Sequence, residues 1–447
     1  MSIVAKFGGT SLATREQMEK VMDIVLSNPE RKVVVVSAPG DRFKGDTKLT
    51  ELLITASKDY RQNGSDSNLD QISERITSLL PEKSALTSSL LSDLRHRLTE
   101  TNRSNYEYNI KAFGEYASAR IFTSLLEARG VNAVFLDPNN IGLTAIEKNG
   151  LVLPDPQSYS RIGKLLPSQA KGRIAVVPGF YAYTRRGKLV TFPRGGSDTT
   201  GAILSRGIEA EVYENWTDEN GLRAADPKIC PDSPVIKEIT LEEARELAYN
   251  GFKLQFDSLR PLLDGRTMLN VRNTNNPTEP GTRIMQKRMA QGEERIIGIA
   301  SKPGYMLLDI YKPGMNQEIG FGRDVLDILL SENINYEHNP TGYDSMSLII
   351  ERDQIQSGKL DRLLSGIKKK VKPEEITYRD KIAILAVVGL GMRSHPDVPG
   401  RTLSALAKEN IHQLTLNKGA TDLSMFIGIE ENRRIDAVKA VYNEFFG

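Results

Sequence analysis

A lysine and two glycines follow the first strand-like run of the chain. The sequence there reads Lys6-Phe7-Gly8-Gly9-Thr10-Ser11 and precedes a helical pattern. Two glycines allow phosphate oxygens to approach the backbone N–H groups, a helix N-terminus adds partial positive charge, and Lys6 can neutralise a transferring phosphoryl group. The motif favours a nucleotide-phosphate site without the P-loop pattern. A strand that ends in an ordinary Gly-Gly turn is the simpler interpretation.

An arginine, two glycines and an acid gather in a second motif. The chain reads PRGGSDTTG from residue 193, between a strand-like run and a helical pattern. Arg194 offers a two-pronged donor for a carboxylate, the Gly195-Gly196 backbone can bend around an anion, and Asp198 is suited to hold a lysine. We therefore expect an anion site. The alternative is that Asp198 is a simple helix N-cap.

A third motif is a loop rich in turn-forming residues. It reads NWTDENG from Asn215 and continues to Asp226-Pro227-Lys228. A loop that leaves a strand of an open α/β sheet is a favourable place for ligand contacts. Taken alone, the motif is equally typical of an ordinary surface loop with Trp216 half buried.

Composition excludes several classes of protein. Lys and Arg number 59 against 57 Asp and Glu, so no overall field attracts nucleic acid or an acidic membrane. Cys230 is the only cysteine, which rules out an intrachain disulfide and favours the cytoplasm. No leader and no membrane span are expected from the sequence. The four histidines all lie outside the three motifs, so a histidine base or a histidine-rich metal site is not expected.

Short runs rich in Val and Ile alternate with helical patterns before residue 290. The runs cover 3–7, 32–38, 131–136 and 173–178, and the helical patterns include 15–26 and 106–129. This alternation predicts a layered α/β domain with a parallel sheet. Residues 61–105 carry leucines at helical spacing among polar residues, and we expect an exposed helical insertion there.

Two similar stretches follow a polar boundary at 291–295. Residues 307–350 and 382–429 each run strand, turn, helix, Asn-Ile, strand, turn, strand. Each copy matches a βαββ part of a ferredoxin-like unit. The sequence thus predicts a region at 1–290 followed by domains at 295–372 and 380–447, with Lys368–Lys370 as a solvated linker.

Five groups of residues together resemble the aspartate kinases of the amino-acid kinase superfamily. They are Lys6–Ser11, Phe113-Gly114-Glu115, Arg194–Thr200, the Thr217-Asp218 loop that ends at Asp226-Pro227, and Asn273-Thr274 with Gly281-Thr282. The repeats are similar to the paired ACT domains of that family. The resemblance covers essentially the whole chain. It implies a carbamate kinase-like layered α/β catalytic domain and two ferredoxin-like βαββαβ ACT domains, whose copies could interleave.

The activity implied by the resemblance is that of a monofunctional aspartate kinase. Such an enzyme uses ATP with Mg²⁺ to phosphorylate the side-chain carboxylate of L-aspartate, the first step of lysine, threonine and methionine biosynthesis. An acceptor carboxylate with a pKa of about 4 is already ionised and needs no general base, which agrees with the lack of histidines in the motifs.

The resemblance also implies roles for individual residues. Lys6 and Asp198 are the expected catalytic residues. Those expected to hold aspartate are Ser37, Thr50, Glu115, Arg194, Gly195, Gly196 and Ser197. Those expected to hold ATP are Lys6, Gly8, Gly9, Thr10, Thr217, Asp218, Arg223, Lys228, Lys253 and Leu254. The chain has Phe256-Asp257 where the family often has His-Pro. Glu115 lies in a helical pattern, where a solvated glutamate would be ordinary.

Regulation by an amino acid is expected at the first repeat. By resemblance to lysine-sensitive aspartate kinases, an effector would meet Met315, Ile319, Glu337, Thr341 and Asp344. Lysine is favoured, threonine stays open, and so does an ACT pair that only joins subunits into a homodimer or homotetramer. Two other functions are kept as alternatives. One is a related kinase acting on another acid, and the other is an amino-acid sensor with an inactive kinase domain.

Overall fold

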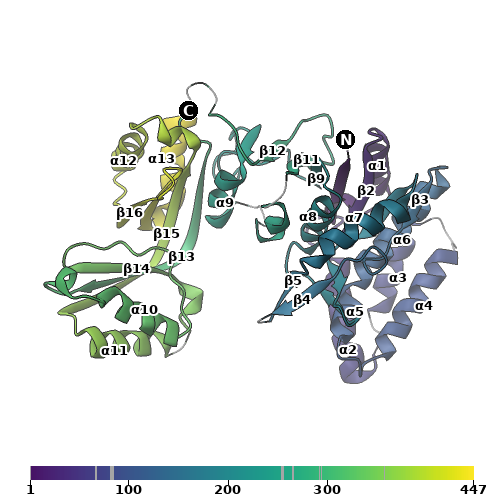
Figure 1. Ribbon diagram of the computed structural model, residues 1–447, viewed down its shortest axis with the longest axis horizontal. Helices are drawn as coiled ribbons and strands as arrows, with labels where there is room; N and C mark the ends of the chain where they lie inside the picture. Colours follow the sequence, from purple (N-terminus) through teal and green to yellow (C-terminus); the bar gives the residue numbers. More distant parts are fainter. Residues whose placement is uncertain are drawn as a thin grey trace. The chain divides into compact units, whose positions relative to one another are not determined.

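The computed structural model describes residues 2–65, 68–80, 85–148, 150–252, 256–263, 266–290, 292, 294–356 and 358–447, without the side chains of 256 and 257. The chain divides into two compact units (Figure 1). The first consists of Met1–Leu222, Val235–Leu241 and Gln255–Arg288. The second consists of Arg223–Pro234, Glu242–Leu254 and Met289–Gly447.

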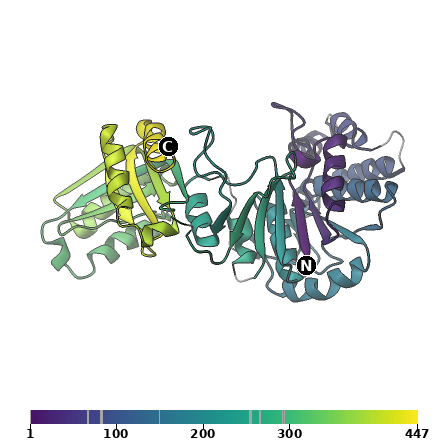
Figure 2. The same ribbon diagram turned by 90° about the horizontal axis from the view of Figure 1, so that it is seen from above.

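An eight-stranded sheet forms the centre of the first unit, in the order β10-β12-β11-β9-β1-β2-β6-β3. Its strands are β1 (Ile3–Phe7), β2 (Arg31–Val36), β3 (Ala133–Phe135), β6 (Ile174–Pro178), β9 (Val212–Thr217), β10 (Glu238–Thr240), β11 (Met268–Asn273) and β12 (Thr282–Met285). Only the β11–β12 pair is antiparallel among the neighbours in this sheet. In Figure 2 the first strand of the chain, β1, lies beside β9, which follows more than 200 residues later. The predicted parallel sheet is confirmed.

Helices cover this sheet, and two small hairpins adjoin it. The helices are α1 (Arg15–Leu26), α2 (Leu49–Asn63), α3 (Leu69–Thr77), α4 (Ala85–Thr99), α5 (Tyr106–Lys111), α6 (Phe113–Ala128), α7 (Gln157–Ala170) and α8 (Gly196–Gly207). The hairpins pair β4 (Ala145–Lys148) with β5 (Leu151–Pro154), and β7 (Tyr181–Tyr183) with β8 (Leu189–Thr191). The helix predicted at 106–129 is in fact two helices, which meet at Ala112.

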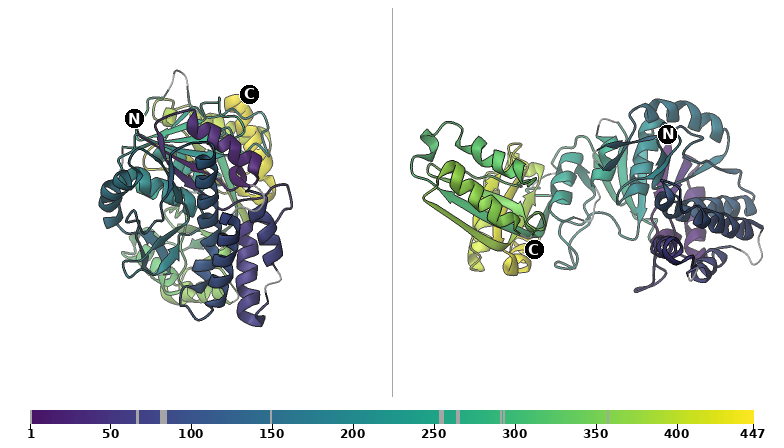
Figure 3. Two further views of the ribbon diagram at one scale, coloured as in Figure 1. Left: turned by 90° about the vertical axis from the view of Figure 1, so that its right-hand side faces the viewer. Right: turned by 90° about the horizontal axis from the view of Figure 1, so that it is seen from below.

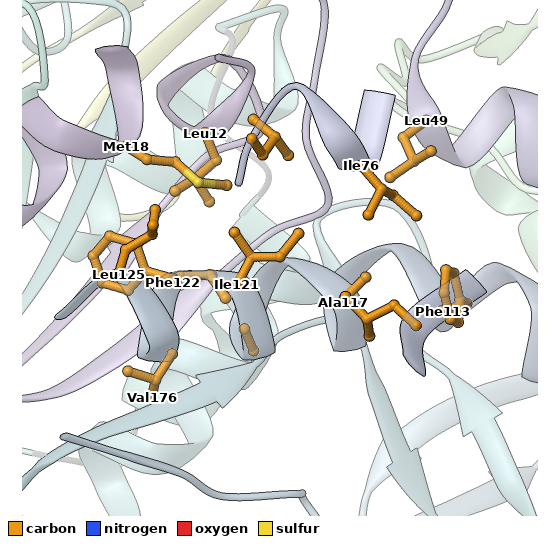
Figure 4. Close-up of a cluster of buried hydrophobic side chains, with 14 of the residues drawn as sticks. Leu12, Met18, Leu49, Ile76, Phe113, Ala117, Ile121, Phe122, Leu125 and Val176 are labelled. Carbon is orange, nitrogen blue, oxygen red and sulfur yellow. The ribbon is translucent and has the colours of Figure 1, made fainter. Parts of the chain in front are cut away.

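Side chains of β1 alternate between two faces of the sheet, as the pleat of a strand requires. Ala5 and Phe7 join the large core formed with α1 and α6, which Figure 4 shows in close-up. Val4 and Lys6 point to the other face, where α8 packs. The alternation therefore directs Lys6 toward the helix that follows the second motif.

The predicted insertion at 61–105 is helical but is not simply exposed. Figure 3 shows the helices α2 to α5 packed side by side. Their apolar residues are buried in the same core as the sheet, among them Ile72, Ile76, Leu90, Leu94 and Leu98. Leucines at helical spacing were the correct signal for helices, but their burial shows that the insertion is part of the domain core.

The second unit contains a five-stranded antiparallel sheet in the order β14-β13-β15-β17-β16. Its strands are β13 (Gly298–Tyr311), β14 (Ser345–Glu351), β15 (Glu375–Val388), β16 (Thr415–Lys418) and β17 (Ser424–Glu430). Its helices are α9 (Leu241–Tyr249, nearly all in this unit), α10 (Phe321–Ser331), α11 (Lys359–Val371), α12 (Val398–Lys408) and α13 (Arg434–Phe446).

The two long strands of this sheet each serve two hydrophobic cores. Ile299 of β13 and Leu385 of β15 pack with α12 and α13. Leu308 of β13 and Ile376 of β15 pack with α10 and α11 instead. Both strands are irregular near their middles, where the register shifts between Lys302 and Leu307. One continuous sheet thus carries both sequence repeats.

The predicted linker at Lys368–Lys370 is wrong in one respect. The three lysines are exposed, as expected, but they form the last turn of α11. Cations are favourable at a helix C-terminus because they face the negative end of the helix dipole. None of the described helices is long and apolar enough to span a membrane.

Candidate active site

The candidate active site lies where parallel strands of the first unit end. Gly8–Thr10 follows β1, Ser37–Gly40 follows β2, Gly179-Phe180 follows β6, and Asp218 follows β9. Because the carboxyl ends of parallel strands meet at one edge of a sheet, these loops come together. The fold thereby brings the first and third motifs to the same edge.

Lys6 forms an ion pair with Asp198 across this edge. Its Nζ lies 2.5 Å from Asp198 Oδ1, and the side chains are only 10% and 17% exposed. Lys6 Nζ also donates to Asn215 Oδ1 at 3.2 Å. Asn215 is opposite Lys6 in the β1–β9 register. Sequence reasoning quoted Asn215 within the third motif but assigned it no role.

The second motif begins α8. Gly195, at a φ of 80°, is the N-cap, a left-handed conformation that favours glycine. Asp198 stands in the first turn of α8, so the alternative that Asp198 is the N-cap is wrong. A Cβ on Gly196 would lie 2.6 Å from the Phe180 ring. Gly195 is therefore favoured by its backbone conformation and Gly196 by close packing, apart from any contact with an anion.

Twelve of the residues expected at the site line one cavity of 470 Å³. They are Lys6, Gly9, Thr10, Ser37, Thr50, Glu115, Arg194, Gly195, Gly196, Ser197, Asp198 and Asp218. The remaining lining residues, which sequence reasoning did not assign, are Ala38, Pro39, Gly40, Asp41, Lys48 and Phe180. The cavity thus joins the phosphate motif, the arginine motif and the Glu115 triplet.

Glu115 is buried at the start of α6 and borders the cavity. Removal from water raises its pKa to about 8, although backbone N–H groups of Ala38 and of Glu115 itself act in the opposite direction. Its Oε2 has no hydrogen-bond partner among the described residues. A buried carboxyl group with an unused acceptor is suited to an ammonium ligand.

Phe180 is a pocket residue that no sequence signal indicated. Its φ of 71° is in the left-handed region, which bulky residues rarely adopt. The backbone is held there by its N–H, which donates to Thr200 Oγ1 at 3.1 Å, and by its carbonyl, which accepts from Phe192 at 2.8 Å. Such strained positions cluster at functional sites.

Several residues expected to hold ATP are not among those that line the cavity. Gly8 donates its N–H to the carbonyl of Trp216 at 3.1 Å, and Thr217 donates its hydroxyl to Asp218 Oδ1 at 3.0 Å. Arg223 and Lys228 belong to the second unit, where Arg223 donates to the carbonyl of Ser233 at 2.7 Å. Lys253 and Leu254 lie outside the described residues, as do the side chains of Phe256 and Asp257. Trp216 is fully buried, so the expectation of a half-buried Trp216 in an ordinary surface loop is wrong.

The residues expected at the effector site differ in their burial and in their contacts. Met315 is buried in the core with α10 and α11, whereas Ile319 is fully exposed. Glu337 accepts a hydrogen bond from Tyr249 of α9. Asp344 Oδ1 accepts from the N–H of Gly314 at 2.7 Å, and Thr341 forms a bridge with Met346.

This arrangement is typical of a phosphotransferase that brings two anions together. Glycine loops and a paired lysine are suited to phosphates, while an arginine and a buried acid are suited to an amino acid. The profile of the Amino acid kinase family matches residues 1–268, and an ACT domain profile matches residues 385–445.

Individual relatives agree with these profiles. Aspartokinase 3 of Bacillus subtilis is 35% identical over 450 residues, which cover 99% of this chain and 98% of the relative. The crystal structure of the aspartate kinase of Clostridium acetobutylicum is similar with a TM-score of 0.83 and 33% identity, covering 99% of both chains. Escherichia coli aspartokinase III, in complex with aspartate and ADP, has a TM-score of 0.79 at 22% identity over the whole of both chains and supports the fold. The chain belongs to the amino acid kinase family and, within it, to the aspartokinases.

Proposed function

We propose that this chain transfers the γ-phosphoryl group of ATP to the side-chain carboxylate of L-aspartate, forming 4-phospho-L-aspartate. The observation that carries the proposal is the single cavity that joins the Lys6–Asp198 pair to Glu115 and Arg194. The first pair is suited to phosphate, and the second to the α-ammonium and α-carboxylate of an amino acid. A substrate held at both of its α groups presents its side chain toward the phosphate loop.

On the donor side, we assign Gly8, Gly9 and Thr10 to the phosphates and Lys6 to the transferring group. Asp198 holds the Lys6 ammonium in place, so that the charge is already oriented when negative charge moves during transfer. Asp218 lines the same cavity. Thr217, Arg223, Lys228, Lys253 and Leu254 remain proposed nucleotide contacts.

On the acceptor side, we assign Arg194 to the α-carboxylate and Glu115 to the α-ammonium. Ser37 and Thr50 are assigned to the side chain of aspartate, and the backbone of 195–197 to its carboxylates. The acceptor carboxylate is already ionised near neutral pH and attacks without a base. Catalysis then consists of aligning two anions and neutralising their charge.

Mg²⁺ is proposed to arrive with ATP. The described residues contain no group of three or more His, Cys, Asp or Glu side chains that could hold a metal ion. Magnesium commonly binds through one or two carboxylates together with substrate phosphates, and Asp198 and Asp218 border the cavity. When bound, the ion neutralises charge on the phosphates.

We further propose that 1–290 is the catalytic region and that the ACT repeats at 295–372 and 380–447 interleave through the shared strands β13 and β15. An amino acid, lysine in the first instance, is the proposed inhibitor at the first repeat. Assembly into a homodimer or homotetramer through the ACT domains and a cytoplasmic location complete the proposal.

The test is ATP-dependent formation of an acyl phosphate, trapped as the hydroxamate by hydroxylamine. L-Aspartate, L-glutamate and N-acetylglutamate are compared, each with and without lysine or threonine. Turnover of aspartate alone supports the proposal, and inhibition identifies the effector. Turnover of another acid contradicts the aspartate assignment. A folded protein that binds an amino acid but turns over none of the acids would instead be a sensor.

A further inference from the structure

The backbone of Gly40 joins two loops of the cavity. The donor loop is Gly8–Thr10, after β1, and the acceptor loop is Ser37–Lys48, between β2 and α2. The N–H of Gly40 donates to the carbonyl of Gly9 at 2.8 Å. A Cβ on Gly40 would lie 2.6 Å from the carbonyl carbon of Gly9, so the two backbones are in contact. The position of one loop therefore fixes the position of the other.

Arg75 of α3 holds the carbonyl group of the same residue. Its Nη2 donates to the carbonyl of Gly40 at 2.5 Å. Its Nη1 donates to Asp46 Oδ2 at 2.5 Å and to the carbonyl of Thr47 at 3.2 Å. All three acceptors belong to the acceptor loop, and the Arg75 side chain is only 3% exposed. A planar guanidinium with fixed donor directions sets the geometry of such a loop better than a flexible ammonium does.

Asp46 completes the anchor of the acceptor loop. Arg42 donates to both of its carboxylate oxygens, at 3.0 and 3.1 Å. Hydrogen bonds from Arg42 are the main reason that the pKa of Asp46 lies well below its ordinary value, and the charge of Arg75 acts in the same direction. The anchor thus stays charged at neutral pH.

Arg75 does not itself border the cavity, but the loop it holds does. Gly40, Asp41 and Lys48 line the cavity, and Thr50 follows in the first turn of α2. Phosphoryl transfer requires the reacting atoms to lie roughly 3–3.5 Å apart and in line. A small shift of the acceptor loop would change the distance from aspartate to the phosphate.

We propose that Arg75 is a positioning residue for phosphoryl transfer. It holds the Gly40 carbonyl so that the acceptor loop stays in contact with the donor loop, and thereby aligns the aspartate carboxylate with the γ-phosphate. This inference rests on the proposed function. It gives the helical insertion, which contains Arg75, an indirect part in the reaction.

The test compares Arg75→Met with Arg31→Met in the full-length protein. Arg31 is a matched control because it is also a buried arginine of the first unit, paired with an acid, Glu214, at 2.7 Å. It lies at the start of β2, at the end of the strand opposite the cavity. Both variants are expected to lower Tm. Only Arg75→Met is expected to lower kcat, by about 10²-fold, which is the cost of a misplacement of about 1 Å.

Two further variants keep the result decisive. Arg75→Lys retains the charge but not the fork of donors, and it is expected to recover Tm more than kcat. Gly40→Ala disturbs the contact between the Gly40 and Gly9 backbones directly, and it should lower kcat by a similar factor. Its control is Gly400→Ala, where an added Cβ meets nothing within 4 Å. If Arg75→Met does not fold, the kcat values of Arg75→Lys and Gly40→Ala test the positioning role.

The outcomes separate this inference from the proposed function. Wild-type protein without aspartate turnover would overturn both. Normal wild-type turnover, with kcat unchanged in the folded Arg75 variants and in Gly40→Ala, would overturn the positioning role alone and leave Arg75 a stabilising residue.

Discussion

The Nζ of Lys6 lies 2.5 Å from Oδ1 of Asp198, although the two residues come from a strand and a helix almost two hundred positions apart. A Cβ on Gly8 would lie 3.7 Å from the same Nζ, so the ammonium stands beside the glycine loop. The carboxylate fixes the ammonium at the point where phosphate oxygens are expected. This relationship leads to the first prediction.

Replacing Lys6 with alanine should lower kcat by about 10²–10³-fold, the cost typical of removing one preorganised charge or donor from a transition state. Steady-state rates of hydroxamate formation measure it. Lys32→Ala is the matched control, because Lys32 is an exposed lysine on the neighbouring strand β2. A Lys6→Ala rate close to that of the control would contradict the phosphoryl assignment.

Arg194→Ala should mainly weaken the use of aspartate. An arginine that binds a carboxylate contributes about 1.5–3 kcal/mol, so KM for aspartate is expected to rise by roughly 10- to 100-fold while KM for ATP stays unchanged. Arg186, exposed in the turn between β7 and β8, provides the control Arg186→Ala. An altered ATP dependence with an unchanged aspartate dependence would reverse the assignment.

Local signals predicted much of this fold. The helix Arg15–Leu26 was predicted at its observed bounds from its helical pattern, and in the structure Thr14 caps it, accepting from Gln17 N–H at 3.3 Å. No such signal marks Ala112, where one predicted helix becomes two. Alanine favours helices, so this break depends on tertiary packing that the sequence pattern does not show.

The site residues that lie in recognisable motifs were predicted from the sequence. Those that depend on a contact between distant segments were missed. Lys6, Asp198 and Glu115 lie in recognisable motifs, and the structure brings them to one cavity. Phe180 and Gly40 do not, because a strained backbone and a contact between two loops arise only when the sheet brings separate strand ends together. The burial of Glu115, and hence its unusual pKa, is likewise a property of the folded chain.

The acidity of Glu115 predicts a pH dependence. Burial raises its pKa to about 8, whereas an unfolded glutamate has a pKa of about 4.3. Between these values the folded protein holds one more proton than the unfolded chain, so a rise in pH through this window lowers stability. Glu115→Gln removes this effect. Its Tm relative to wild type, measured without substrate from pH 5 to 9, should increase with pH.

Binding of aspartate should show the opposite dependence at the same residue. The α-ammonium of aspartate favours the charged carboxylate, so binding below pH 8 must release the proton. KM for aspartate is therefore expected to fall as pH rises from 6 to 8, by at most about tenfold per pH unit. Glu115→Gln should bind aspartate weakly and lose this slope. A wild-type KM for aspartate that is independent of pH over this range would contradict the assignment of Glu115 to the α-ammonium.

The last prediction concerns the contact between Tyr249 and Glu337. The Tyr249 hydroxyl donates to Glu337, and burial, followed by this hydrogen bond, raises the pKa of the Tyr249 phenol well above its ordinary value. The phenol therefore stays protonated and donates to Glu337, the acid that, by resemblance to lysine-sensitive aspartate kinases, is expected to meet the ammonium group of the effector. An effector has to displace it. Tyr249→Phe should lower the inhibitor concentration for half-maximal inhibition by roughly tenfold, since a hydrogen bond to a charged group contributes about 1.5 kcal/mol.

Glu337→Ala should have the reverse effect and relieve inhibition, with activity in the absence of effector retained. Inhibition curves for lysine and threonine on both variants provide the measurement. Tyr336→Phe is the control, because Tyr336 is an exposed tyrosine next to Glu337. Inhibition that is retained in Glu337→Ala would place the effector elsewhere. Relief of inhibition in Glu337→Ala with an unchanged Tyr249→Phe curve would instead show that the tyrosine does not compete for this acid.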